Sequence, residues 1–431
     1  MQTYNDKFAQ EMLNVPKEKR LISSSIDAGC TYIGQMISHD IVPPTSKINQ
    51  PSRSSLSWAL NLNSLYDDLK SNQKFENYEK KANGAYDFLR IRKEVENKIK
   101  YIAKIEEKRN DENAIISQLH IFWITLHNHI IDKYNVNSKK AREWVTLAFQ
   151  LVVVHDFLHQ ILDKKVFKRY FLDNKTYLDK DFLTSFEANV PDFFRNASFR
   201  FGHSMVRSKY DLGGKNPRGT KLHKLFNRNS TFDINNKIDW QRFFYSQKAL
   251  NIDTYISPLM GKVPQDASKS IEHIIPKLNL VASQNLFTVN LLSELKRRHN
   301  WNDIQKECGV EILEQSAMEK ASFRNVEPDI TRLSLWPYLL LEAQVLRKGA
   351  HLGPLGSILN AEVLKISIQR AEYSIYEKFN PEIYSLPKAL SKMGRFGKDI
   401  EAQLGSLNQK PDFFDGKKKY SLMKTLINLN T

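Results

Sequence analysis

The sequence predicts a mainly α-helical protein that forms one large domain with few or no strands. Apolar residues recur mostly at helical spacing along the chain. Hydrophobic residues make up 41% of the 431 residues, which is enough to build a large core and argues against disorder over most of the chain. Neither an internal repeat nor a low-complexity linker divides the sequence. A single domain is therefore the simplest interpretation, although this length allows two or three.

The chain divides into an N-terminal arm with little periodicity at 1–30 and the helical domain at 31–431. Within the domain, residues 47–70 form a predicted loop rich in Ser and Asn. The highly charged segment 71–112 is predicted to be peripheral.

The clearest helix is predicted at 114–133, where apolar residues share one stripe. A second helix is predicted at about 140–163, and it is apolar almost all round near its middle, which indicates burial. Further helices are predicted at 199–206, 285–298, 335–348 and 358–378.

The formal net charge of +16 is spread along the chain, and the closest basic run is Lys417–Lys419. A solvated basic surface explains this charge better than a specific nucleic-acid site, for which there is no motif. The two cysteines, Cys30 and Cys308, form no CxxC pair, which argues against a disulfide framework or a cysteine zinc site. No apolar stretch reaches the roughly 18 residues needed to span a bilayer, so we expect no transmembrane segment and a cytoplasmic location.

The first segment with a chemical pattern is Gly34–Asp40. On a helix, Gln35 and His39 stand at i and i+4 and share a face. His39 as a base and Gln35 as a hydrogen-bond donor would then face the same cavity. The alternative is a helical turn with incidental polar residues.

The second segment is Phe199–Val206. Because Gly202 has no side chain, a planar cofactor can approach His203 closely, and neutral imidazole is a good axial ligand for haem iron. Arg200 lies three residues earlier and suits an anionic propionate. The alternative is a buried histidine packed in a helix.

A third group consists of His120, His127 and His129 on the helix predicted at 114–133. No HExxH pattern is present, and His129 falls on a different face from the other two. Structural hydrogen bonding is therefore favoured over metal binding.

Together these segments resemble the animal-type haem peroxidase family, especially its bacterial members. Residues 34–40 are similar to the distal motif Gly-Gln-x-x-Asp-His-Asp, and residues 199–204 to the proximal motif Phe-Arg-x-Gly-His-Ser. Residues 119–128 resemble Leu-His-x-x-x-x-Arg-x-His-Asn. Further matches follow in the family's order, at 141–162, 238–244 and 335–363.

The resemblance implies a mostly helical fold around a buried haem b. His203 would be the proximal iron ligand, and Asn290 would accept its imidazole N–H. His39 would be the distal base that takes a proton from hydrogen peroxide and returns it to the leaving oxygen, with Gln35 as its polar neighbour. Arg200 would pair with a haem propionate. Cyclooxygenase-like members carry a tyrosine at that position, so the resemblance is to the peroxidase branch.

The main departure from the family pattern is Thr125, which stands where the family has a catalytic arginine. Loss of one such charge-stabilising donor costs about 3–4 kcal/mol in comparable sites, so we expect a slow reaction with hydrogen peroxide. His129, one turn further along, is the candidate replacement donor. Ser38 and Leu126 replace the carboxylates that esterify haem in mammalian members, so haem would be held without ester links.

The calcium loop also departs from the pattern. The family supplies a carboxylate equivalent to Asp40 and an Asp-rich loop, whereas this chain has Asn61 and Asn63, with Ser57 as a further oxygen. Calcium prefers anionic oxygens, so we expect weak calcium binding or none. Ser293 and Glu294 replace a likely propionate partner after Asn290.

The sequence thus favours a haem-dependent peroxidase that uses hydrogen peroxide and an unknown electron donor, with a role in the response to oxidative stress. A degenerate haem-binding scaffold or sensor is the second hypothesis. A basic binding protein that uses the fold without haem is the third.

Overall fold

The chain is represented by a computed structural model that describes most of its length. The described residues are 4, 7–8, 11–12, 20–43, 58–67, 73–81, 86–95, 97–176, 190–213, 219–226, 238–256, 301–321, 329–377, 385–406 and 421–430.

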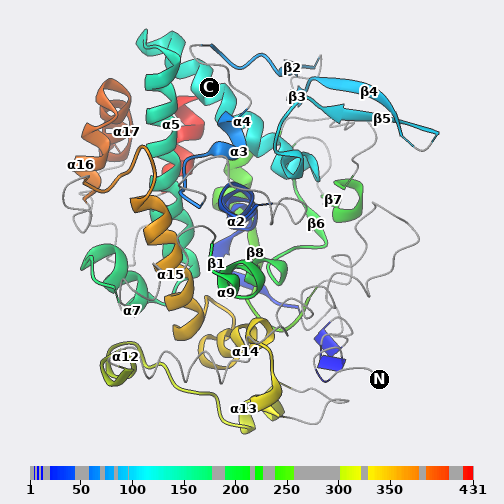
Figure 1. Cartoon of the computed structure of the whole chain (residues 1–431), viewed down its shortest axis with the longest axis vertical. Helices are drawn as coiled ribbons and strands as arrows, with labels where there is room; N and C mark the ends of the chain where they lie inside the picture. The colour runs from blue at the N-terminus through cyan, green and yellow to red at the C-terminus, as the bar shows by residue number, and fades with distance from the viewer. Residues whose placement is uncertain are drawn as a thin grey trace.

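The described chain is mainly helical, as predicted (Figure 1). The α-helices are α2 (Ala28–Ile41), α3 (Asn63–Tyr66), α4 (Ala114–Tyr134), α5 (Ser138–Val152), α6 (His159–Ile161), α7 (Lys164–Phe167), α9 (Asp192–Asn196), α12 (Trp301–Cys308), α13 (Ser316–Lys320), α14 (Leu335–Arg347), α15 (Pro354–Gln369), α16 (Leu386–Ser391), α17 (Gly394–Ser406) and α18 (Leu422–Leu429). The 3-10 turns are η3 (Lys108–Asp111), η6 (Ser198–His203), η7 (Leu222–Lys224) and η11 (Ile330–Arg332), and the π-helical turns are η4 (Val153–Leu158), η5 (Lys168–Leu172) and η8 (Arg242–Ser246).

The described strands are short and form two-stranded antiparallel pairs. The strands are β1 (Ile22–Asp27), β2 (Tyr78–Lys80), β3 (Tyr86–Phe88), β4 (Arg90–Val95), β5 (Lys98–Ala103), β6 (Lys209–Tyr210), β7 (Thr220–Lys221) and β8 (Lys248–Leu250). They pair as β1 with β8, β2 with β3, β4 with β5 and β6 with β7. Residues 22–30, within the predicted arm, thus form β1 and the start of α2.

Helix α4 confirms the helix predicted at 114–133, and its ends have clear local causes. The side chain of Asn113 accepts hydrogen bonds from the backbone N–H groups of Ile115 and Ile116, which caps the first turn. Asn135 adopts the left-handed conformation that ends helices. The predicted helix at 285–298 lies outside the described residues.

The helix predicted at about 140–163 is also confirmed, as α5, η4 and α6 in succession. The stretch Ser138–Ile161 is long and apolar enough to cross a membrane by length and composition alone. However, 89% of its apolar window is buried inside the fold, and core helices pass the same test. The predicted helix at 358–378 begins earlier, at Pro354, because proline is favoured in a first helical turn.

Helix α2 lies near the middle of the molecule, while the β4–β5 hairpin projects at its periphery (Figure 1). The apolar side chains of α2 are buried, whereas Thr31, Gly34, Gln35 and Ser38 keep accessible surface. These four positions follow helical spacing and form one stripe, which we call the accessible stripe of α2. A central helix therefore presents one open face that carries Gln35.

Candidate functional site

His39 is oriented by a segment that precedes α4. Its Nδ1 lies 2.8 Å from Oδ1 of Asn110, and the guanidinium of Arg109 donates to its backbone carbonyl at 2.9 Å. The amide nitrogen of Asn110 lies 3.0 Å from Nδ1 of His120. Because that nitrogen donates, Oδ1 of Asn110 accepts, and Nδ1 of His39 carries the proton. This network assigns the lone pair of His39 to Nε2.

Gln35 is held by Glu112 and Asn113 of the same segment. Its amide nitrogen donates to the carboxylate of Glu112, and its carbonyl oxygen accepts from the side chain of Asn113 at 3.4 Å. The five residues Arg109–Asn113 are hereafter the distal platform. The expectation that segment 71–112 is peripheral was therefore wrong at its C-terminal end, because this end contacts both Gln35 and His39.

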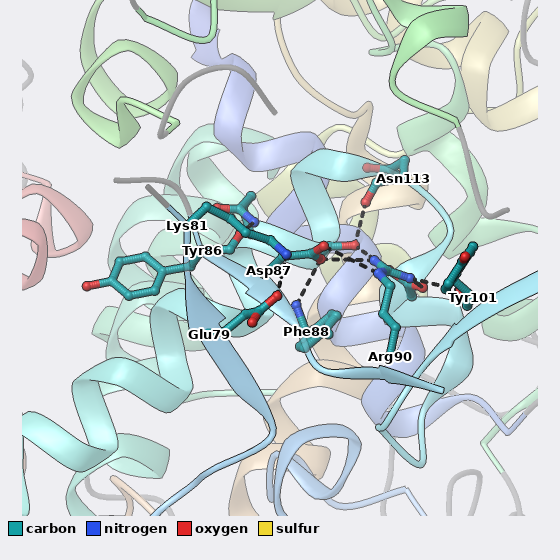
Figure 2. Close-up of polar contacts among 11 residues, drawn as sticks. Glu79, Lys81, Tyr86, Asp87, Phe88, Arg90, Tyr101 and Asn113 are labelled. Atoms are coloured by element: carbon teal, nitrogen blue, oxygen red, sulfur yellow. Dashed lines mark hydrogen bonds and ion pairs between the residues drawn. The ribbon is translucent and has the colours of Figure 1, made fainter. Parts of the chain in front are cut away.

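The distal platform is anchored by a buried ion-pair network at the base of the β4–β5 hairpin. The guanidinium of Arg90 donates to Asp87 at 3.0 Å and to Asp111 at 2.6 and 2.8 Å. Figure 2 shows it pointing at Asp87 and at the backbone of Tyr101. Burial lowers the pKa of Arg90, but the hydrogen bonds and charges of the two carboxylates outweigh it and raise that pKa above its ordinary value.

Replacement of Arg90 by methionine is expected to destabilise the protein by about 3–5 kcal/mol, because two buried carboxylates lose their counter-ion. The side chain of Arg90 is only 4% exposed, so solvent screens this network little. Urea unfolding followed by circular dichroism measures the change. Arg92→Met, at an exposed position of the same strand, is the matched control. A loss below about 1 kcal/mol for Arg90→Met would show that the network is not an anchor.

His203 lies in η6, where its Nδ1 donates to the backbone carbonyl of Arg200 at 2.9 Å. The indole N–H of Trp336 donates to the same carbonyl at 3.1 Å, and its ring packs edge-to-face on the imidazole at 6.3 Å. Burial and the charge of Arg200 lower the pKa of His203 to about 4, so the ring is neutral near pH 7. Its Nε2 thus carries a lone pair suited to a metal.

Open space and a positive charge lie beside His203. A Cβ atom added at Gly202 would meet nothing within 4 Å. Arg200 donates to the carbonyl of Arg195, and burial and repulsion from Arg195 lower the pKa of Arg200 to about 10. Among the described residues, no carboxylate forms an ion pair with Arg200. A partly buried guanidinium in this state is stabilised by an added anion.

Phe157 connects the two histidine-bearing segments. A Cβ atom at Gly34 would lie 3.2 Å from its ring, on the accessible stripe of α2. The same ring lies 6.2 Å from that of Phe199 and 6.4 Å from that of Phe201. The structure thus brings segments 34–40 and 199–206, far apart in the sequence, next to one phenylalanine.

Thr125 forms its hydrogen bonds within α4 and with the residue that follows α18. Its hydroxyl donates to the carbonyl of Phe122 at 2.8 Å and accepts from Asn430, just beyond α18, at 3.1 Å. Asp156 holds the other end of α18 by accepting from the backbone N–H groups of Leu422 and Met423. Thr125, the residue expected from the sequence to replace a catalytic arginine, is thus tied to the residue that follows the C-terminal helix.

The oxygens of the predicted calcium residues accept hydrogen bonds from the chain itself. The carboxylate of Asp40 accepts from the backbone N–H groups of Leu62 and Ser64 at 2.9 and 2.8 Å. Asn61 accepts from the N–H of Glu372 at 2.7 Å, and Asn63 from the guanidinium of Arg142 at 3.4 Å. Within the described part of the chain, no group of three or more His, Cys, Asp or Glu could hold a metal ion.

Several predicted site residues, namely Ser57, Asn290, Ser293 and Glu294, lie outside the described residues. Conversely, motif reasoning missed Arg109, Asn110, Glu112 and Trp336 as site residues. The signal for the first three was the run of polar residues 107–113 directly before a strongly apolar helix. Polar residues directly before a helix lie beside the elements that the helix packs against, which here include α2.

Comparisons with known proteins show the fold and the family of the chain. No match was found among curated protein sequences. A solved structure, that of the fatty acid alpha-dioxygenase from Oryza sativa, superposes with a TM-score of 0.55 at 14% identity, over 95% of this chain and 78% of that chain. This likeness shows a shared fold. The family model described as animal haem peroxidase matches residues 54–385, which include α4 and the His203 segment and begin after His39. Because that match covers well over half of the sequence, the chain belongs to the animal haem peroxidase family.

Proposed function

We propose that the protein is a haem-dependent oxidoreductase of peroxidase type, which uses hydrogen peroxide to oxidise a small electron donor. The observation that carries the proposal is the pair formed by His39 and His203. In each ring Nδ1 donates to a fixed oxygen, so the lone pair of the neutral imidazole lies on Nε2. Phe157 joins the segments that bear the two rings.

The residues beside His203 fit a haem. The open space at Gly202 admits a planar group, and Arg200 offers a cation without a described carboxylate partner. Nε2 of His203 would hold the iron, and Arg200 would pair with a propionate. A haem b held without covalent links is proposed, since Ser38 and Leu126 supply no ester carboxylate. When bound, haem supplies the redox-active iron that carries oxidising equivalents from peroxide to the donor.

His39 supplies the proton transfers in this proposal. Its Nε2 would accept a proton from one oxygen of hydrogen peroxide and return it to the other, departing oxygen. Asn110 holds the required tautomer, and Arg109 fixes the backbone at the same residue. Thr125 offers no cation to the departing oxygen, so the reaction is expected to be slower than in members with arginine. The proposal leaves calcium out, because Asp40, Asn61 and Asn63 already accept hydrogen bonds from the chain and two of these three side chains are uncharged amides.

A haem-binding sensor or scaffold with little turnover is the second candidate. One observation favours it, namely the hydrogen bond that Asn430 donates to Thr125. The residue that stands in place of the family's catalytic arginine is thus used for a structural contact.

Two measurements on the purified protein test the proposal. After expression with a haem precursor, a Soret band that co-elutes with the protein in gel filtration is expected. Addition of hydrogen peroxide and guaiacol should then oxidise the donor faster than the same amount of free haem. A Soret band without this excess rate would favour the sensor or scaffold, and the absence of the band would exclude both.

A further inference from the structure

The β4–β5 hairpin projects from the core and is exposed on both of its faces. Four consecutive residues of β4, at 91–94, are exposed. Successive side chains of a strand point to opposite faces, so a strand that packed on the core would alternate buried and exposed residues. The hairpin also lies at the edge of the molecule (Figure 1). Both of its faces are therefore open to a partner.

Apolar side chains are concentrated on this hairpin. Within the described part of the chain, three of the seven large apolar side chains that are exposed belong to it, namely Ile91, Ile99 and Tyr101, at 47%, 47% and 38% exposure. Ile99 and Tyr101 are two residues apart on β5 and share a face. Single apolar side chains are ordinary on a protein surface, whereas a group of them on one projecting element is typical of an interaction surface.

Basic residues accompany these apolar side chains. Residues 91–104 hold five lysines and arginines against two glutamates, a net charge of +3, whereas the charges at 106–109 cancel. Arg92 and Lys93 are exposed, and Arg92 lies opposite Tyr101 in the register of the two strands. The projecting hairpin is therefore both basic and apolar.

The buried ion-pair network described above holds the hairpin at its base. Arg90, the first residue of β4, donates to Asp87 and Asp111, and its side chain is only 4% exposed. The base of the hairpin is thus fixed before any partner binds. A surface that is already ordered loses little conformational freedom on binding.

The charges argue against pairing with a second copy of the chain. Lys93 lies opposite Lys100 in the register, and lysines on exposed strands oppose edge-to-edge association between identical chains. An anionic partner avoids this repulsion. Among anionic partners, a phospholipid surface also takes up aliphatic and tyrosine side chains at the boundary between headgroups and acyl chains. A nucleic acid binds through charge and aromatic stacking and offers no such environment to isoleucine.

From these observations we propose that the β4–β5 hairpin docks the protein on the surface of an anionic phospholipid membrane. The lysine and arginine side chains of the hairpin contact the headgroups, while Ile99 and Tyr101 enter the interface below them. The attachment is peripheral and involves no membrane-spanning segment. This inference does not depend on the binding of haem, so it can be tested and can fail separately from the proposed function.

Flotation of the full chain with phospholipid vesicles tests the proposal. Vesicles of phosphatidylcholine mixed with phosphatidylserine should bind the protein, and vesicles of phosphatidylcholine alone should not. Added salt should weaken this binding, because it screens the attraction between exposed charges. Equal binding to both kinds of vesicle, or binding to neither, would overturn the proposal.

A first double variant tests the role of charge at the hairpin. Lys93→Gln combined with Lys100→Gln should weaken binding to the mixed vesicles by about fivefold for each lysine removed. The control is Lys164→Gln combined with Lys165→Gln, an exposed pair on α7 with the same loss of charge, which should weaken it far less. An equal loss in both double variants would show that only the net charge of the chain matters and would overturn the hairpin assignment.

A second double variant tests the apolar contact. Ile99→Ser combined with Tyr101→Ser should weaken binding by at least about tenfold, because two apolar side chains no longer enter the interface. Ile312→Ser combined with Tyr245→Ser removes the same two residue types from exposed positions elsewhere and should bind like the wild type. Because all four side chains are exposed, both variants should keep the circular dichroism spectrum of the wild type. Binding of labelled RNA or duplex DNA through the hairpin, without binding to vesicles, would overturn the proposal and assign a nucleic-acid partner instead.

Discussion

Replacement of His203 by alanine is expected to abolish retention of haem. The neutral imidazole of His203 is the proposed iron ligand, and the Nδ1 bond to the carbonyl of Arg200 fixes its ring. Without it, only the contact of Arg200 with a propionate and apolar packing would remain. The measurement is the ratio of Soret to protein absorbance after gel filtration, which should fall to the background of an unrelated protein.

Two controls show whether the loss of haem is specific to His203, namely rescue by imidazole and substitution of an exposed histidine. Added imidazole should restore the Soret band of His203→Ala, because the deleted side chain leaves room for it beside Gly202. His223→Ala, at an exposed position, should retain haem like the wild type. Persistence of the band in His203→Ala without imidazole would refute the assignment of the ligand.

Replacement of His39 by alanine is expected to retain haem and to slow the reaction with hydrogen peroxide by roughly 10²–10⁴-fold, the usual contribution of a general acid–base. Stopped-flow absorbance of the Soret band measures this rate directly, without an electron donor. A pH dependence of this rate that arises from titration of His39 in the wild type should be lost in the variant, since the titrating base is gone.

Asn110→Ala provides a graded comparison with His39→Ala. It leaves the imidazole in place but removes the oxygen that selects the Nδ1–H tautomer. Its rate should fall between those of the wild type and His39→Ala, with an altered pH profile. If His39→Ala reacts as fast as the wild type, His39 is not the distal base and the proposed proton transfers are wrong.

The site was predictable from sequence where its residues lie close together in the chain. Gln35 and His39 share a helical face because they are four residues apart, and Arg200 and His203 occupy one turn. Helix α4 was predictable because apolar spacing and the Asn113 cap act locally. The partners of Gln35 and His39 were not predictable, because Glu112 and Asn110 lie more than seventy positions from them in the chain.

The roles of Asp40 and Thr125 show the same limit. Motif comparison identified both positions, but hydrogen bonding decides what each side chain does. Asp40 accepts from the backbone N–H groups of Leu62 and Ser64, and Thr125 contacts Asn430 at the far end of the chain. The backbone N–H groups and the side-chain amide of Asn430 that make these contacts are brought close only by folding, so the local sequence does not reveal them.

By itself, the sequence determined the helical architecture and the two histidine motifs, because periodicity, caps and short spacings are properties of neighbouring residues. The tertiary structure alone decided which nitrogen of each imidazole carries its proton, which carboxylate borders Gln35 and which buried cation anchors the distal platform. Those outcomes depend on contacts between distant segments, where burial makes every polar group find a partner.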